Sequence, residues 1–117
     1  AAFANDVMVR YLDWNDGYIS VGSGHPSDSI AALITAAEVA GANGLDLIVA
    51  TTIAYEVFCS ICDVWANKPA GVDHSTIGAI ASTAGIGRLM GLSEAQLSEA
   101  INITVASSTA LNQDRNS

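Results

Sequence analysis

The sequence has 117 residues, of which half are hydrophobic and 14% are charged, and its formal net charge is −8. These values predict a single globular domain with a core and exclude a disordered chain. There are four Lys and Arg against twelve Asp and Glu, and no uncharged apolar run reaches about 18 residues, so we expect neither nucleic acid nor a membrane among the partners.

Apolar residues at helical spacing predict five helices and no sheet, so the expected fold class is an all-α multi-helix bundle. The helices are expected near residues 1–12, 27–41, 45–65, 75–90 and 93–111. Ser27 is the expected N-cap of the second helix, and Ser93 with Gln96 fits a capping box at the start of the last one.

Three glycines, Gly78, Gly85 and Gly87, lie inside the fourth predicted helix. A glycine costs about 1 kcal/mol relative to alanine in an exposed helix interior. Such a cost in one helix predicts that neighbouring helices approach its backbone closely.

A polar loop over residues 13–24 separates the first two helices and begins with Asp13, Asn15 and Asp16. His25 follows it. Carboxylates beside a histidine suit proton transfer, because one group can remove a proton while another delivers one. The same residue types are also common as helix caps and turn residues, so spacing alone leaves both interpretations open.

The two histidines share a type of position, because His25 precedes the helix start at Pro26 and His74 precedes the one at Ser75. Free backbone N–H groups and the helix dipole favour an anion at such a place. They also favour a neutral imidazole that can act as a base. Histidines at solvated helix ends that bond only locally are the alternative.

Cys59 and Cys62 lie within a helical pattern and have no second pair of ligands, so we interpret them as buried thiols and expect no metal site. Two cysteines are too few for a disulfide scaffold, and the sequence start lacks the pattern of a signal peptide. A reducing, cytoplasmic location is therefore the expectation. We find no phosphate-binding glycine loop after a strand and expect no cofactor.

Several segments together resemble the MmgE/PrpD family, which includes 2-methylcitrate dehydratase. The segments that carry the resemblance are Ala2–Asp16, Gly24–Asp28, Ala54–Glu56, Asp73–Gly78 and Gly91–Ser93. Each motif is weak alone, but in this order they span nearly the whole chain and include both histidines.

The resemblance implies an acid/base enzyme without metal or organic cofactor that acts on a small tricarboxylate or dicarboxylate, usually as a homodimer. Asp13, His25 and His74 match active-site positions of the family. Substrate contacts are expected at Asp16 and at two helix-start serines, Ser27 and Ser75.

Two departures from the family pattern are present. Gly17 stands where the family commonly has Thr, and Lys68 does not match the family's catalytic-site lysine. We therefore expect residues 1–117 to be one partial helical domain, without the family's second α/β domain and without activity on its own.

The function that the resemblance implies is removal of water from 2-methylcitrate in propionate breakdown. Activity like that of cis-aconitate decarboxylase and epimerisation of a dicarboxylate are alternatives within the family. A non-catalytic helical association module, or a degenerate paralogue, is the alternative from another class.

Overall fold

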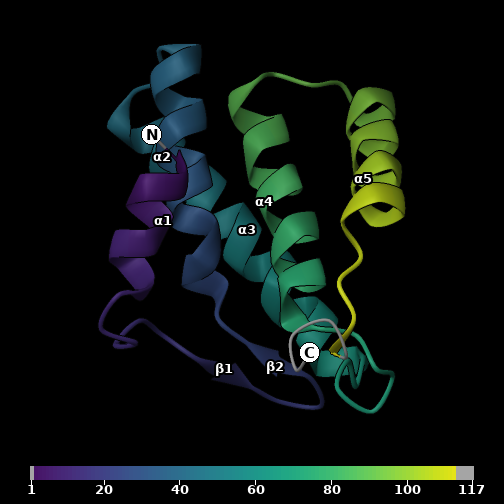
Figure 1. The fold of residues 1–117 in the computed structure, drawn as a ribbon. Helices are drawn as coiled ribbons and strands as arrows, with labels where there is room; N and C mark the ends of the chain where they lie inside the picture. Colours follow the sequence, from purple (N-terminus) through teal and green to yellow (C-terminus); the bar gives the residue numbers. More distant parts are fainter. Residues whose placement is uncertain (1, 113–117) are drawn as a thin grey trace.

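The computed structural model describes residues 2–112, and within this range the chain is mainly helical (Figure 1). The α-helices are α1 (Ala2–Arg10), α2 (Ile30–Ala40), α3 (Gly44–Val64), α4 (His74–Leu89) and α5 (Glu94–Ser108). The expected all-α class is therefore confirmed, although the expected helix start at residue 1 lies outside the described residues.

The core forms where α2, α3 and α4 pack against one another, while α1 packs on α2 and α5 packs on α4 (Figure 1). Its fully buried side chains are mostly small, which lets the helices approach one another. They are Leu33, Ala50, Ala54, Phe58, Cys62, Ile77 and Ala81. A Cβ atom added to Gly85 would lie 2.6 Å from Leu33 Cδ2 and 2.8 Å from the Ala50 carbonyl oxygen. The close approach predicted from this glycine is therefore present.

The expectation of no sheet is wrong for a short hairpin before α2. Strands β1 (Tyr18–Ile19) and β2 (Ser23–Gly24) pair antiparallel, with Tyr18 opposite Gly24. Strands of two residues are too short to show alternation in a sequence. Hydrogen bonds to α3 and to the loop after it hold the hairpin in place. The Gly22 N–H donates to the Cys62 carbonyl at 2.6 Å, and the Ser23 N–H donates to Asn67 Oδ1 at 3.2 Å.

The prediction that Ser27 caps the second helix is also wrong. A 3-10 turn, η1 (Pro26–Ser29), comes first and has His25 as its N-cap, and α2 then begins at Ile30. The predicted capping box at the start of α5 is confirmed, because Ser93 and Gln96 exchange both expected hydrogen bonds.

The chain after α5 returns to the start of α4, so that α5 ends at Ser108 and not near residue 111. The Asp73 N–H donates to the Ala110 carbonyl at 3.0 Å, and the Ala110 N–H donates to Thr76 Oγ1 at 2.9 Å. These bonds hold residues 109–112 beside the end of α4 that carries His74.

By length and composition alone, α3 is the one helix in the described range that could cross a membrane. This criterion is weak, because core helices also meet it. Three acidic residues, Asp46, Glu56 and Asp63, lie along α3. Ala50, Ala54, Phe58 and Cys62 of α3 are buried in the core, whereas Leu45, Ile48 and Val64 are exposed.

Candidate functional site

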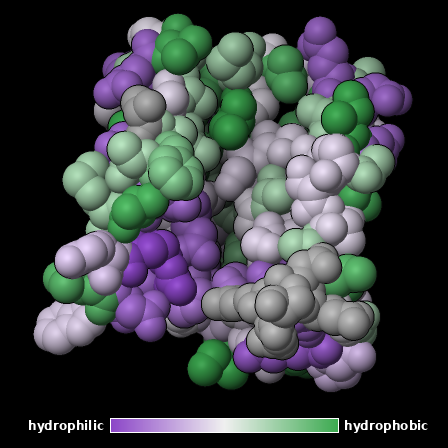
Figure 2. Space-filling model, viewed as in Figure 1, coloured by the Kyte–Doolittle hydropathy of each residue, from purple (hydrophilic) through white to green (hydrophobic). Residues whose placement is uncertain are grey.

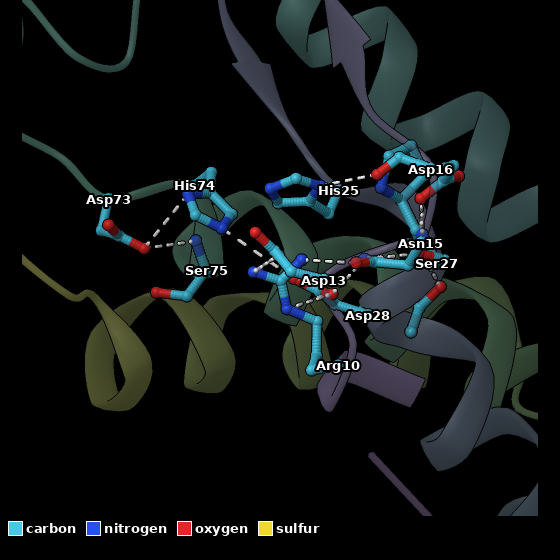
Figure 3. A network of polar contacts seen from close by, with 12 residues as sticks. Arg10, Asp13, Asn15, Asp16, His25, Ser27, Asp28, Asp73, His74 and Ser75 are labelled. Atoms are coloured by element: carbon cyan, nitrogen blue, oxygen red, sulfur yellow. Dashed lines mark hydrogen bonds and ion pairs between the residues drawn. The ribbon is translucent and has the colours of Figure 1, made fainter. Parts of the chain in front are cut away.

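The two histidines meet where the hairpin, η1 and α4 come together (Figure 3). Their ring centroids are 5.4 Å apart and the ring planes are inclined by 73°, an edge-to-face contact. Gly24 allows this approach, since a Cβ atom there would lie 2.7 Å from both His74 Cβ and Phe58 Cζ. The prediction that tertiary packing brings His25 and His74 together is confirmed.

The orientation of the His25 ring is set by the loop before the hairpin. His25 Nδ1 lies 2.6 Å from the backbone carbonyl oxygen of Asp16. A carbonyl oxygen only accepts, so Nδ1 carries the proton and Nε2 of the neutral ring keeps its lone pair. Asp16 is itself held, because its Oδ1 accepts the Ser27 N–H at 3.1 Å. Burial and a hydrogen bond to Asp16 raise the pKa of Tyr55 well above its usual value.

The His74 ring lies between two carboxylates (Figure 3). Its Nδ1 is 3.5 Å from Asp73 Oδ1, and its Nε2 is 3.9 Å from Asp28 Oδ2. Asp73 also caps α4, because its Oδ1 accepts the Ser75 N–H at 2.9 Å. Since a carboxylate accepts and does not donate, both ring nitrogens of His74 face groups that favour a bound proton.

Asp28 and Arg10 belong to the site although the sequence did not single them out. Arg10 Nε is 3.8 Å from Asp28 Oδ1, and Arg10 Nη1 donates to Asn15 Oδ1 at 2.7 Å. Burial raises the pKa of Asp28, and the nearby charges of Arg10, His25 and His74 partly oppose that rise. The sequence signal for each was its place in a family-like segment, Ala2–Asp16 for Arg10 and Gly24–Asp28 for Asp28.

Two clefts adjoin this group and share His74 in their linings. The first, here called the acidic cleft, has a volume of about 620 Å³ and is lined by Arg10, three aspartates and parts of α4 and of the chain after α5. Figure 2 shows a hollow between the α1–α2 side and the α4–α5 side of the molecule. The second, here called the hairpin cleft, has a volume of about 400 Å³. Its lining consists of Gly17, Tyr18, Ile19, Ser23, Gly24, His25, Lys68 and His74.

Asp13 was expected to share a cavity with both histidines, and neither of the two clefts includes it in its lining. The Asp13 side chain is 79% exposed and pairs with Arg10 Nη2 at 3.2 Å. The backbone turns away there, with a φ of 52° at Asp13 directly after α1. A catalytic role for Asp13 stays a prediction, and its position supports the Arg10 side chain.

The predicted substrate-contact residues take up different positions. Ser75 lines the acidic cleft, whereas Asp16 and Ser27 line neither of the two clefts. Ser27 is buried, and its Oγ accepts a hydrogen bond from Asn15 Nδ2 at 3.0 Å. Their contacts with a substrate stay predictions.

The helix starts at His25 and His74 do not offer free backbone donors to an anion as expected. The Ser27 N–H already donates to Asp16, and the Ser75 N–H already donates to Asp73. Protein carboxylates thus accept these N–H groups at both helix starts.

The two thiols agree with the interpretation as inert core groups. Cys62 is buried, Cys59 is half-buried and neither forms a disulfide. Burial raises the pKa of both thiols, which disfavours the reactive thiolate. Within residues 2–112, no three His, Cys, Asp or Glu side chains are grouped so that they could hold a metal ion.

Comparison with known proteins gives one consistent family. The family model for the MmgE/PrpD N-terminal domain matches residues 1–117. An alkylcitrate dehydratase from a fungal species is 34% identical over 115 residues, which is 86% of this chain and 23% of that protein. The 2-methylcitrate dehydratase of Escherichia coli is 26% identical and the one of Cupriavidus necator is 28% identical, each over 88% of this chain and 23% of its own length.

The match covers all of this chain but only part of each relative. This chain spans less than a quarter of the length of these curated relatives. The family match, in contrast, covers every residue of the chain and includes both histidines of the site. The chain therefore belongs to the MmgE/PrpD family, whose N-terminal domain model it matches over residues 1–117.

Proposed function

We propose that this chain is the helical part of a carbon–oxygen lyase that removes water from 2-methylcitrate or another alkyl-substituted citrate. The observation that carries the proposal is the histidine pair, whose rings lie 5.4 Å apart and both line the hairpin cleft. The names of three relatives, an alkylcitrate dehydratase and two 2-methylcitrate dehydratases, supply the substrate class.

The reaction needs one base and one acid on the same substrate. The base removes a proton from the carbon next to a carboxylate, and the electron pair of that C–H bond forms the new C=C bond. The C–O bond to the hydroxyl group breaks, and the acid protonates the departing oxygen so that it leaves as water. General acid–base catalysis of this kind contributes roughly 10²- to 10⁴-fold to the rate.

We assign His25 as the base and His74 as the acid. The Nδ1 proton of His25 is directed at the Asp16 carbonyl, which leaves the Nε2 lone pair for the substrate. His74 lies between Asp28 and Asp73, whose negative charges favour a ring that carries a proton to donate. Asp28, Asp73 and Asp16 act in this proposal as positioning residues.

The test follows the conjugated double bond of the product by ultraviolet absorbance after 2-methylcitrate is added to the intact protein. The informative variant is His25→Asn, because the asparagine amide can still donate to the Asp16 carbonyl while Nε2 is lost. We expect its kcat to fall by about 10²-fold or more, with an unchanged unfolding midpoint. His74→Gln, which keeps a donor near Asp28, should fall similarly.

The outcome decides between this function and the alternatives. Release of carbon dioxide from the substrate would indicate a decarboxylase, and incorporation of solvent deuterium without a double bond would indicate an epimerase. Either result contradicts the dehydratase, as would full dehydration activity in the His25→Asn variant. A folded intact protein without any of these reactions would support an association module.

A further inference from the structure

The two clefts beside the histidine pair differ sharply in charge. The acidic cleft is lined by Asp6, Asp28 and Asp73 against a single cation, Arg10. The hairpin cleft has no Asp or Glu in its lining and contains Lys68. A polycarboxylate placed in the acidic cleft would meet like charges at short range, which is unfavourable where water is partly excluded.

The cations of the described residues are also not equally available. Arg10 is engaged by Asp13 at 3.2 Å and by Asp28 at 3.8 Å. Arg88 lies 4.0 Å from Asp46. Lys68 is the cation of residues 2–112 whose side chain has no ion pair, and it lies beside the two histidines in a chain with a net charge of −8.

The backbone that carries Lys68 is fixed relative to the hairpin. The buried Asn67 side chain accepts the Ser23 N–H at 3.2 Å and donates to the Val72 carbonyl at 3.3 Å. The Lys68 carbonyl accepts the Gly71 N–H at 3.0 Å and Asn112 Nδ2 at 3.2 Å. The ammonium group therefore extends from a tethered loop, which reduces the ordering that binding requires.

We propose that the substrate polycarboxylate binds in the hairpin cleft, with the Lys68 ammonium group holding one of its carboxylates. This inference rests on the proposed function and names where its substrate lies. From the hairpin cleft, both His25 and His74 are within the lining, whereas His25 is not part of the acidic cleft. The Tyr18 hydroxyl already donates its proton to Asp63 at 2.8 Å and is not free to donate to a substrate carboxylate. Lys68 is therefore the principal charged contact in this proposal.

The test measures citrate binding to the intact protein by calorimetry at low ionic strength. Lys68→Met keeps most of the aliphatic stem and removes the charge, and we expect its Kd to rise roughly 10- to 100-fold, as for loss of a charged hydrogen bond. Lys68→Arg should restore most of the affinity. Arg88→Met is the matched control, because Arg88 is a paired cation outside both clefts, and its Kd should not change.

The arms of the experiment separate this inference from the proposed function. If Lys68→Met binds citrate as tightly as the unchanged protein and Arg10→Met loses binding, the substrate lies in the acidic cleft and the inference is wrong. Absence of citrate binding to the unchanged protein overturns it too. Lys68-dependent citrate binding without any dehydration of 2-methylcitrate would support the binding site and contradict the dehydratase.

Discussion

Asp28 and Asp63 are two carboxylates whose surroundings move their pKa values in opposite directions. Burial raises the pKa of Asp28 despite the nearby Arg10. Hydrogen bonds from Ser20 and Tyr18 lower the pKa of Asp63. The folded state thus holds a proton on Asp28 more tightly than the unfolded state does, and it holds one on Asp63 less tightly.

These opposite shifts predict opposite effects of Asp28→Asn and Asp63→Asn. As pH rises from the ordinary carboxyl value of 3.8 through the raised pKa of Asp28, the unchanged protein loses stability relative to Asp28→Asn. For Asp63, the carboxylate stabilises the fold above pH 3.8, and this advantage is lost as pH falls through the lowered pKa. At pH 7, Asp63→Asn should therefore be less stable than the unchanged protein, and Asp28→Asn should be more stable than it.

Urea unfolding of the three proteins at about pH 7, at about pH 4 and at a pH well below the ordinary carboxyl value of 3.8 measures both effects, because the Asp28 effect changes between the first two conditions and the Asp63 effect between the last two. The Asp63 effect should be the smaller one, because that side chain is at the surface and solvent screens its interactions. A pH dependence of the same sign in both variants would contradict the proposed causes of the two shifts.

Most helices could be predicted from the sequence because their signals are local. The apolar periodicity of α3 and the Ser93–Gln96 capping box each lie within one element. The hairpin and η1 could not be predicted, because their stabilising partners lie elsewhere in the chain. Gly22 needs Cys62, and Ser27 needs Asp16 as the partner of its N–H, so tertiary contacts override the local preference for a serine cap.

Gly85, in the C-terminal half of α4, permits a close contact with Leu33 of α2 and with the Ala50 carbonyl of α3, which leads to a prediction at the level of the packed helices. Gly85→Ala should destabilise the fold by about 1–3 kcal/mol, as overpacking does, because the Ala50 carbonyl in its way belongs to the α3 backbone. Improved helix propensity would return at most about 1 kcal/mol. Thermal or urea unfolding measures the difference.

Gly44→Ala is the matched control for Gly85→Ala. Gly44 is the first residue of α3, and a Cβ atom there would meet no atom within 4 Å. Its replacement should leave stability unchanged or raise it by up to about 1 kcal/mol, since alanine has less freedom in the unfolded chain. Equal stability of the two variants would show that α3 and α4 can separate slightly without loss.

At the scale of the whole molecule, the surface formed by α1 and the residues after it contains many exposed apolar side chains. No residue of α1 is buried, and Phe3 is 84% and Met8 68% exposed. Tyr11, Leu12 and Trp14 continue this surface beyond the helix. Contiguous apolar surface of this kind binds hydrophobic probes and promotes association.

We therefore expect the 117-residue chain to enhance the fluorescence of a hydrophobic dye and to sediment faster at higher concentration. Replacing Phe3 and Met8 by Gln should reduce both signals while the helical circular dichroism is retained. Val39→Ser serves as the control, because Val39 is 75% exposed and belongs to α2 and not to α1. Equal dye binding by all three proteins would contradict the prediction.

Part of the site could be predicted because some of its signals, like those of the helices, are local in the sequence. Two histidines at helix starts could be recognised from their neighbours in the sequence, but their contact depends on how α4 packs against η1. The clefts and the positions of Arg10 and Lys68 in them depend on the same packing. Asp13 shows the converse, because a residue that its motif placed among the expected site residues has a largely exposed side chain.

The docking of the hairpin has a consequence for the order in which the molecule folds. Its bonds to Asp63 and Asn67 join residues 45 and 44 positions apart, whereas α3 and α4 are consecutive helices that meet through a short connection. Closing a longer loop costs more conformational entropy than forming a contact between neighbouring segments, so such contacts form later and more slowly. The helical layers are thus expected to form first, and the hairpin to dock on them last. Mild destabilisation should reverse this order and populate a state that keeps its helices but has lost the histidine pair.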